Sequence, residues 1–137
     1  MNRIRLEQRL RRHESLSLKP YLDSEGRLTI GIGRCLDTRG IDLQEAEFML
    51  ARDIDRCLAE CKSLIPGFAS LSDLRQEVLV EMAFQMGMAG VLKFTRMIEA
   101  LRVQDFERAS AEMLDSKWAK QTTTRAQKLA GYMRDGQ

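Results

Sequence analysis

Apolar residues recur at helical spacing along most of the chain, and the clearest run lies near its middle. Between residues 43 and 64 they follow one helical face, formed by Leu43, Ala46, Leu50, Ile54, Cys57, Cys61 and Leu64. Asp42 and Glu45 give this segment a capping-box-like start, and Pro66-Gly67 stops it. The pattern predicts one helix of about 22 residues, long enough to connect two lobes.

Helical patterns are expected on both sides of this segment. Residues 3–13 carry a short amphipathic pattern among many charges. From Ser72-Asp73 onward apolar residues cover much of the helix surface, which is typical of a helix at the centre of a bundle. Gly87 and Gly90 then bracket a turn. The remaining helices are predicted over residues 90–102, from Asp105 to about Ser116, around Trp118, and after Thr123 or Thr124.

A single segment carries a convincing β pattern. Tyr21-Leu22, the turn Asp23–Gly26 and the run Arg27–Gly33 predict a strand, a turn and a second strand. The predicted fold class is therefore α+β and mostly α-helical. We expect a single domain over residues 1–137, with a hairpin lobe (about 15–42), a connecting helix (about 43–65) and a helical lobe (about 66–137). Helix 3–13 is too short to be stable alone and is expected to pack on the helical lobe.

Composition narrows the classes of protein. The 137 residues fit one compact domain, and an apolar fraction of 44% is too high for a disordered chain. Lys and Arg number 22 against 20 Asp and Glu, so the net charge is +2; we expect no nucleic-acid partner, because a dedicated binder would be more basic. The N-terminus lacks the apolar run of a signal peptide, and no stretch approaches the roughly 18 apolar residues of a membrane helix. We expect a soluble chain without stable membrane insertion.

The three cysteines, Cys35, Cys57 and Cys61, are an odd number. Cys57 and Cys61 lie four residues apart on one face of the predicted long helix, a spacing that suits helix packing. Two thiols alone make a poor zinc site, and the single histidine, His13, is distant in sequence. We expect reduced, buried or partly buried thiols and no metal site.

The run TIGIG at residues 29–33 raises the question of a phosphate-binding loop. A dinucleotide loop needs a third glycine between a strand and a helix, and a Walker loop needs Gly-Lys-Ser/Thr; both signals are missing. Glycines in a strand instead allow another group to approach the backbone closely.

Two carboxylates, Glu14 and Asp23, precede this run in the sequence. Glu14 ends the first predicted helix, Asp23 begins the hairpin turn, and Thr29 lies on the returning strand. A helix end and a hairpin can converge on one point, and a pair of carboxyl groups with a held water suits glycoside hydrolysis. In the simpler interpretation Asp23 is a turn residue, Glu14 a surface acid and Thr29 a strand residue. Spacing alone favours that simpler interpretation.

Three ordered segments resemble the phage-type lysozymes, the endolysins and muramidases of glycoside hydrolase family 24. The first is Glu14, then Tyr21-Leu22-Asp23-Ser24-Glu25-Gly26, then Thr29-Ile30-Gly31-Ile32-Gly33. The second is Phe84-Gln85-Met86-Gly87 with Gly90-Val91 and Phe94. The third is Ser116-Lys117-Trp118 with Gln121-Thr122 and Arg125-Ala126. The resemblance covers most of the chain and implies a lysozyme-like two-lobe fold.

The resemblance also implies residue roles. Glu14 would be the general acid, Asp23 the carboxylate that positions the attacking water or stabilises the cation, and Thr29 a partner that holds the water. Phe84 and Gln85 would contact substrate, although Phe84 suits a core position equally well. Arg125 would lie near Glu14 and oppose its protonation, so burial of Glu14 would have to outweigh that charge.

The sequence departs from the family pattern at several positions. Arg34 replaces a histidine, and we expect it to form an ion pair with Asp53. Two sugar-contacting polar positions of the family correspond to Met97 and Glu112 here. The segment between Gly33 and Asp42 is short, so we expect a reduced hairpin lobe and a more open cleft.

By this resemblance the chain is expected to be a muramidase that cleaves the β-1,4 bond between N-acetylmuramic acid and N-acetylglucosamine with inversion. Neither metal nor organic cofactor is implied, and we expect a monomer whose partner is the peptidoglycan glycan strand. It would be made in the host cytoplasm without a signal peptide and act on the periplasmic cell wall. A lytic transglycosylase, a binding module without turnover, a structural helical domain, and one domain of a larger particle component are alternatives.

Overall fold

The structure is a computed structural model that describes residues 1–136; residue 137, the last of the predicted domain, lies outside that range. The described residues form seven α-helices, one 3-10 helix and one three-stranded antiparallel sheet, so the predicted α+β, mostly helical fold class is confirmed. Contacts divide the chain into two compact units, Met1–Phe48 and Met49–Gln137, here called the hairpin unit and the helical unit.

The hairpin unit holds one helix and the sheet. Helix α1 (Arg3–Glu14) begins where the Asn2 side chain accepts a hydrogen bond from the Arg5 amide, an N-cap that satisfies one of the free amides of the first turn. Strands β1 (Ser17–Leu22), β2 (Leu28–Gly31) and β3 (Arg34–Cys35) follow in the order β1-β2-β3. The predicted helix and hairpin are thus present, and β3 is an additional strand.

Strand boundaries differ from the prediction in two places. Strand β1 starts at Ser17 and includes Pro20, near a register shift between Ser17 and Tyr21; proline has no amide to donate to the ladder, so it suits such an irregularity. Strand β2 ends at Gly31 and does not continue to Gly33. Gly31 and Gly33 have φ angles of 71° and 69°, which non-glycine residues rarely adopt, and the chain reverses there into β3.

Helix α2 (Leu43–Leu64) has the start that the sequence predicts. The Asp42 side chain accepts from the Glu45 amide and the Glu45 side chain accepts from the Asp42 amide, both at 2.9 Å. This reciprocal pair is a capping box. The boundary between the two units falls within α2, and the buried residues of α2, Cys57 and Cys61, belong to the helical unit.

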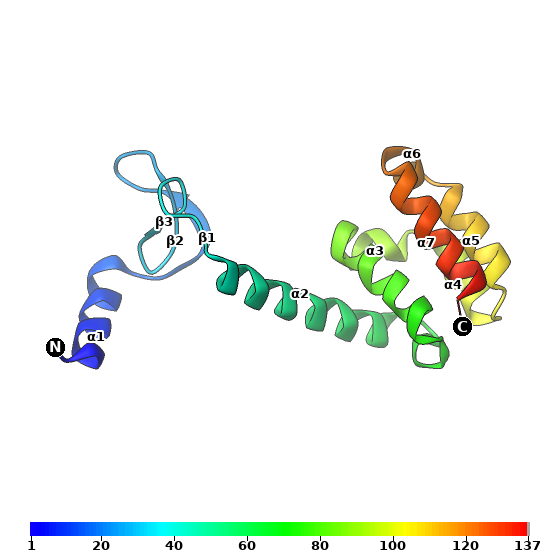
Figure 1. The fold of residues 1–137 in the computed structure, drawn as a ribbon, viewed down its shortest axis with the longest axis horizontal. Coiled ribbons are helices and arrows are strands. Elements are labelled where there is room, and N and C mark those ends of the chain that lie inside the picture. The colour runs from blue at the N-terminus through cyan, green and yellow to red at the C-terminus, as the bar shows by residue number, and fades with distance from the viewer. Residues whose placement is uncertain (137) are drawn as a thin grey trace. The chain divides into compact units, whose positions relative to one another are not determined.

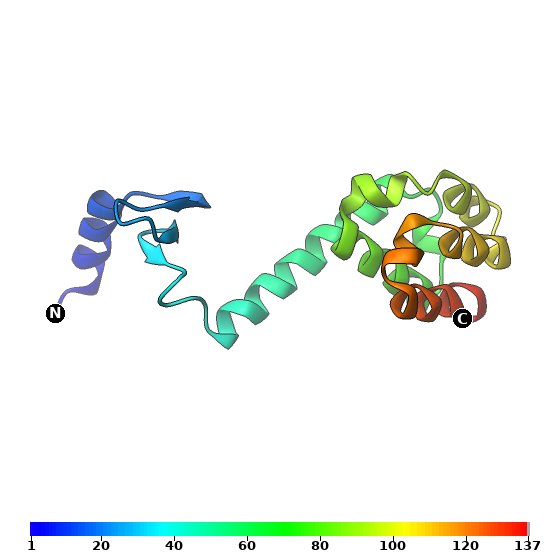
Figure 2. The ribbon, with the colours of Figure 1, turned by 90° about the horizontal axis from the view of Figure 1, so that it is seen from above.

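The helical unit contains η1 (Phe68–Ser70), α3 (Asp73–Leu92), α4 (Thr95–Arg102), α5 (Phe106–Leu114), α6 (Lys117–Gln121) and α7 (Thr123–Asp135). In Figures 1 and 2 helices α3 to α7 gather into one bundle, in which α7 contacts α3, α5 and α6. The largest fully buried side chains of this bundle are Phe68, Leu79, Met82, Met97, Met113 and Met133. The core of the helical unit is therefore contiguous and rich in methionine.

Two polar anchors fix α7 in the bundle. The Arg75 guanidinium donates to the backbone oxygens of Met133 at 2.8 Å and Arg134 at 3.0 Å, where the last carbonyls of a helix lack intrahelical partners. The buried Ser110 hydroxyl donates to the Ala130 oxygen at 2.7 Å.

The predicted turn between Gly87 and Gly90, with a helix from residue 90 to 102, is wrong in its details. Gly87 alone leaves helical geometry, with φ 76° and ψ 159°, and α3 resumes through Gly90 to Leu92. Helix α4 starts only at Thr95. Gly87 with its positive φ is enough to bend the helix, so no second break is needed at Gly90.

Within residues 1–136 no single helix has both the length and the apolar character of a membrane span. Helices α3 and α4 reach that level only as a pair, and they are bent by 97° at the break between them.

The three thiols are expected to differ in reactivity. Burial raises the pKa of the Cys61 thiol to about 11, whereas a hydrogen bond with the Thr38 side chain lowers the pKa of the half-buried Cys35 thiol. Because the thiolate is the nucleophile, iodoacetamide near neutral pH should label Cys35 first and Cys61 only on unfolding. Peptide mass spectrometry after timed labelling checks this, and labelling of Cys61 in the folded protein at the rate of Cys35 would contradict it.

Candidate active site

The Glu14 carboxyl group lies directly against the backbone of Gly33. A Cβ atom built on Gly33 would stand 2.6 Å from Glu14 Oε2 and 2.9 Å from its Cδ, closer than real Cβ contacts. Ser15, with φ 63°, turns the chain from the end of α1 toward β1. The helix end and the β2–β3 turn therefore meet at Glu14 and Gly33, and glycine is the residue that leaves room for the carboxyl group.

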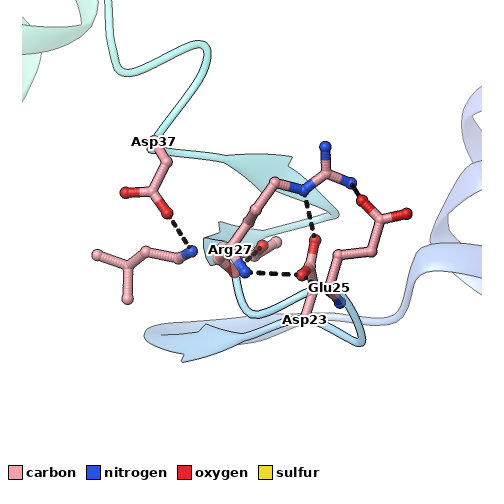
Figure 3. Close-up of polar contacts among 6 residues, drawn as sticks. Asp23, Glu25, Arg27 and Asp37 are labelled. Carbon is pink, nitrogen blue, oxygen red and sulfur yellow. Dashed lines mark hydrogen bonds and ion pairs between the residues drawn. The ribbon is translucent and has the colours of Figure 1, made fainter.

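Asp23 begins the turn between β1 and β2, and its carboxylate is held by that turn (Figure 3). Oδ1 accepts from the backbone amides of Glu25 at 2.9 Å and Arg27 at 2.8 Å, and Oδ2 accepts from Arg27 Nε at 3.4 Å. The Arg27 amide is the main cause that lowers the pKa of Asp23, and the Glu25 amide and the Arg27 guanidinium act in the same direction. Asp23 is therefore a carboxylate at neutral pH, as a base requires.

Thr29 lies on β2 and is only 4% exposed. Its hydroxyl donates to the Arg27 backbone oxygen at 3.0 Å, and the same oxygen accepts from the Asp23 amide at 2.9 Å. A hydroxyl has one proton and two lone pairs, so this donation leaves Thr29 Oγ1 as an acceptor toward any further partner. The structure thus brings Asp23 and Thr29 to one backbone oxygen.

The two residues expected to contact substrate lie in the helical unit. Phe84 is 45% exposed and lines an open groove together with the apolar residues Leu50, Ile54, Leu58 and Val80 and the acidic residues Asp73, Glu77 and Glu81. Phe84 is thus a groove residue and not a core residue. The role of both Phe84 and Gln85 toward substrate stays a prediction.

Gln85 has a structural partner that the sequence does not reveal. Its Oε1 accepts from the indole Nε1 of the buried Trp118 at 2.9 Å, and Trp118 packs edge-to-face on Phe94 with ring centroids 6.1 Å apart. A buried indole N–H needs such an acceptor. Gln85 therefore ties α3 to α6 inside the helical unit.

The expected ion pair between Arg34 and Asp53 concerns residues of different units and stays a prediction, while each residue has a partner within its own unit. Arg34 pairs with Glu45 at 2.5 Å, and Asp53 pairs with Arg56 at 3.6 Å. The Glu45 carboxylate accepts from the Asp42 amide in the capping box, which holds it at the start of α2 within reach of Arg34 on β3.

Arg125 on α7 pairs with Glu81 on α3 at 2.9 Å. Its expected proximity to Glu14 concerns residues of different units and stays a prediction. Of the two altered sugar-contact positions, Met97 is fully buried in the core, and the half-buried Glu112 lines a pocket of the helical unit with Lys93, Arg96 and Lys117.

Sequence reasoning missed two other residues of the hairpin unit. Arg27 supplies an amide, a guanidinium and a carbonyl oxygen to the groups around Asp23 and Thr29. Asp37, after β3, accepts from the Leu28 amide at 2.7 Å and so links the end of the sheet segment to the start of β2 (Figure 3). An Asp at the first position of a turn commonly bonds amides a few residues on, and that tendency was the available signal for Arg27. Among residues 1–136 no group of three or more His, Cys, Asp or Glu is arranged to hold a metal ion.

Gly33→Ala is expected to lower the hydrolysis rate far more than its loss of thermal stability would explain. The new Cβ would push the Glu14 carboxyl group away, and misplacing a reacting group by about 1 Å can cost about 10²-fold in rate. Gly31→Ala is the matched control, since Gly31 has a similar φ of 71° but nothing within 4 Å of its Cβ position. Hydrolysis rates and thermal unfolding of both variants are the measurement. Equal losses of activity in the two would contradict the role of Gly33.

A mostly helical α+β chain with a helix-end glutamate against a small hairpin that carries a turn aspartate and a buried strand threonine is typical of the lysozyme class of glycoside hydrolases. The sequence model described as phage lysozyme matches residues 11–134. This match covers most of the chain, and the chain belongs to the phage lysozyme family.

Several known proteins are similar to this chain. It is 33% identical over 148 residues to the pre-baseplate central spike protein Gp5 of Enterobacteria phage T4, an alignment that covers 88% of this chain and 26% of the spike protein. It is 24% identical to the protein named Probable T4-type lysozyme 1 of Dictyostelium discoideum, covering 93% and 92%. It is 30% identical to the endolysin of Acyrthosiphon pisum secondary endosymbiont phage 1, covering 81% and 75%. The chain thus spans about a quarter of the spike protein and most of the other two.

Proposed function

We propose that the protein is a muramidase that hydrolyses the β-1,4 bond between N-acetylmuramic acid and N-acetylglucosamine in peptidoglycan, with inversion at the anomeric carbon. The observation that carries this proposal is the contact of the Glu14 carboxyl group with Gly33, because it joins one carboxyl group to the hairpin that bears Asp23 and Thr29. Family membership supports the same reaction class. Inversion requires carboxyl groups about 6.5–9.5 Å apart, with room for a water.

Glu14 acts as the general acid in this proposal. It gives its proton to the glycosidic oxygen as the bond from that oxygen to the anomeric carbon breaks. Glu14 is exposed in the chain without substrate. A sugar strand bound over Glu14 would shield the carboxyl group from water, as a general acid requires.

Asp23 and Thr29 hold and activate the water. The Asp23 carboxylate accepts one water proton, and Thr29 Oγ1, whose own proton is donated to the Arg27 oxygen, accepts the other. The water lone pair then points at the anomeric carbon from the face opposite the leaving oxygen. The water oxygen bonds to that carbon, and the proton that it loses passes to Asp23.

The cell wall is the proposed site of action. Peptidoglycan carries carboxylate groups, and the last turn of α1, next to Glu14, carries Arg11, Arg12 and His13. Such a basic turn favours approach of an anionic polymer. We propose that the protein is made in the host cytoplasm, acts as a monomer and cleaves the wall in the periplasm.

The deciding experiment follows the products from purified peptidoglycan. Wild-type protein should clear the walls and release muramic acid with a free reducing end, and NMR during the first turnovers should show the α-anomer. An initial β-anomer would overturn inversion. An anhydro-muramic product would identify a lytic transglycosylase, and a folded protein that leaves accessible walls intact would overturn the muramidase proposal.

A further inference from the structure

We propose that Arg27 is a positioning residue for hydrolysis, which orients the Asp23 carboxylate and the Thr29 hydroxyl together toward the attacking water. The inference rests on the proposed function, since it assigns a role in that reaction. Arg27 follows the turn on the N-terminal side of β2, four residues after Asp23. Figure 3 shows its guanidinium between the carboxylates of Asp23 and Glu25.

The contacts of Arg27 reach both groups of the water site. Its amide donates to Asp23 Oδ1 at 2.8 Å, and its Nε donates to Asp23 Oδ2 at 3.4 Å. Its carbonyl oxygen accepts from Thr29 Oγ1 at 3.0 Å. One residue thus contacts both oxygens of the proposed base and sets the direction of the Thr29 hydrogen bond.

The Arg27 guanidinium fixes the orientation of the Asp23 carboxylate, which the backbone amides alone do not fix. The terminal torsion of an aspartate is broad, so a carboxylate held through one oxygen can still rotate. The Arg27 side chain holds the second oxygen, and its other end is anchored by Glu25 Oε2 at 2.5 Å. The planar guanidinium spans the two carboxylates, which a lysine ammonium does not reproduce.

An exposed ion pair in itself contributes little to stability. The side chain of Arg27 is 47% exposed and that of Asp23 is 25% exposed, so the pair is screened by solvent. A merely structural role would therefore leave catalysis almost unchanged. A positioning role predicts a change in turnover and in its pH dependence without a matching change in thermal unfolding.

The charged groups near Asp23 fix the sign of the pH effect. Arg27 favours the ionised form of Asp23, whereas Glu25 in the turn and Asp37 after β3 are acids. Removing the guanidinium raises the pKa of Asp23, so activity should be lost at a higher pH as the medium is acidified. The shift is partial, because the amides of Arg27 and Glu25 remain.

The test compares Arg27→Gln with Arg27→Lys and with Lys19→Gln, which removes a cation from the exposed strand β1 of the same sheet. We expect Arg27→Gln to lower kcat about tenfold with KM within about twofold. Loss of an exposed ion pair alone would change an equilibrium by roughly fivefold at most, so a tenfold loss of kcat exceeds it. The expected loss is smaller than the roughly hundredfold decrease in rate caused by displacing a reacting group by about 1 Å. Arg27→Lys should restore part of kcat, and Lys19→Gln should resemble wild type.

Carbon-13 NMR titration of the Asp23 carboxyl group gives a readout that does not need activity. In Arg27→Gln its midpoint should lie above that of the wild type, and the acidic limb of the kcat profile should move with it. An active Arg27→Gln variant with the kcat, the pH profile and the Asp23 midpoint of the wild type would overturn the inference. An inactive wild type whose Asp23 midpoint still rises in Arg27→Gln would overturn the muramidase proposal but leave the Arg27–Asp23 contact supported.

Discussion

Glu14→Gln is expected to abolish clearing of purified cell walls while the protein stays folded. Glutamine has nearly the same shape and fits beside Gly33, but it has no proton to give to the glycosidic oxygen. General acid catalysis contributes about 10²- to 10⁴-fold, so we expect a loss of about 10³-fold. The measurement is the initial rate of release of reducing ends, together with thermal unfolding of the variant.

Glu7→Gln is the matched control for Glu14→Gln. Glu7 lies on the same helix and pairs with the exposed Arg3 at 2.9 Å, and its replacement by glutamine removes the same charge. Its rate should remain within about twofold of wild type, because an exposed i,i+4 pair contributes little. Full activity of Glu14→Gln would show that another residue is the acid.

Asp23→Asn is expected to lower the rate by about 10²-fold or more without unfolding the hairpin. The asparagine side-chain oxygen can still accept from the Glu25 and Arg27 amides, so the turn persists. The amide cannot take a proton from the water, and the base is lost. Initial rates on purified peptidoglycan and thermal unfolding are the measurement.

Adding azide to the Asp23→Ala variant distinguishes two roles of Asp23, a base that activates water and a residue that only binds sugar. Azide attacks without losing a proton, so it should restore turnover and yield a glycosyl azide of inverted configuration. Asp37→Asn is the matched control, because it removes a charge from the same unit and retains an oxygen for the Leu28 amide. A rate for Asp23→Asn equal to that of Asp37→Asn would contradict the base role.

Local patterns were sufficient for the elements whose signals lie within a few residues. Helix α2 runs over the predicted residues because its apolar face is periodic and because Asp42 and Glu45 cap each other three residues apart. The turn that begins at Asp23 is likewise local. Strand β3 was missed because it has two residues, too few for a period, and because it pairs only after the chain reverses at Gly31 and Gly33.

Partner choice was the part that local patterns could not predict. Arg34 pairs with Glu45, a partner that the sequence did not reveal, because the capping box turns the Glu45 carboxylate toward the sheet. Gln85 accepts from Trp118, a residue 33 positions away, because the bundle brings α3 beside α6. Neither of these two pairs can be predicted from the spacing of residues along the chain.

The resemblance to the phage-type lysozymes, and not residue spacing, singled out the candidate residues Glu14, Asp23 and Thr29, and their roles stay predictions. The sequence by itself determined the mostly helical α+β class, the long helix α2 and the hairpin turn. These follow from periodicity, capping and turn chemistry, which act over short stretches of chain. Only the tertiary structure decided that Gly33 receives the Glu14 carboxyl group and that Arg27 joins Asp23 to Thr29. Such contacts depend on how the helix end and the strands pack, because atoms within hydrogen-bond reach are selected by folding and not by order along the chain.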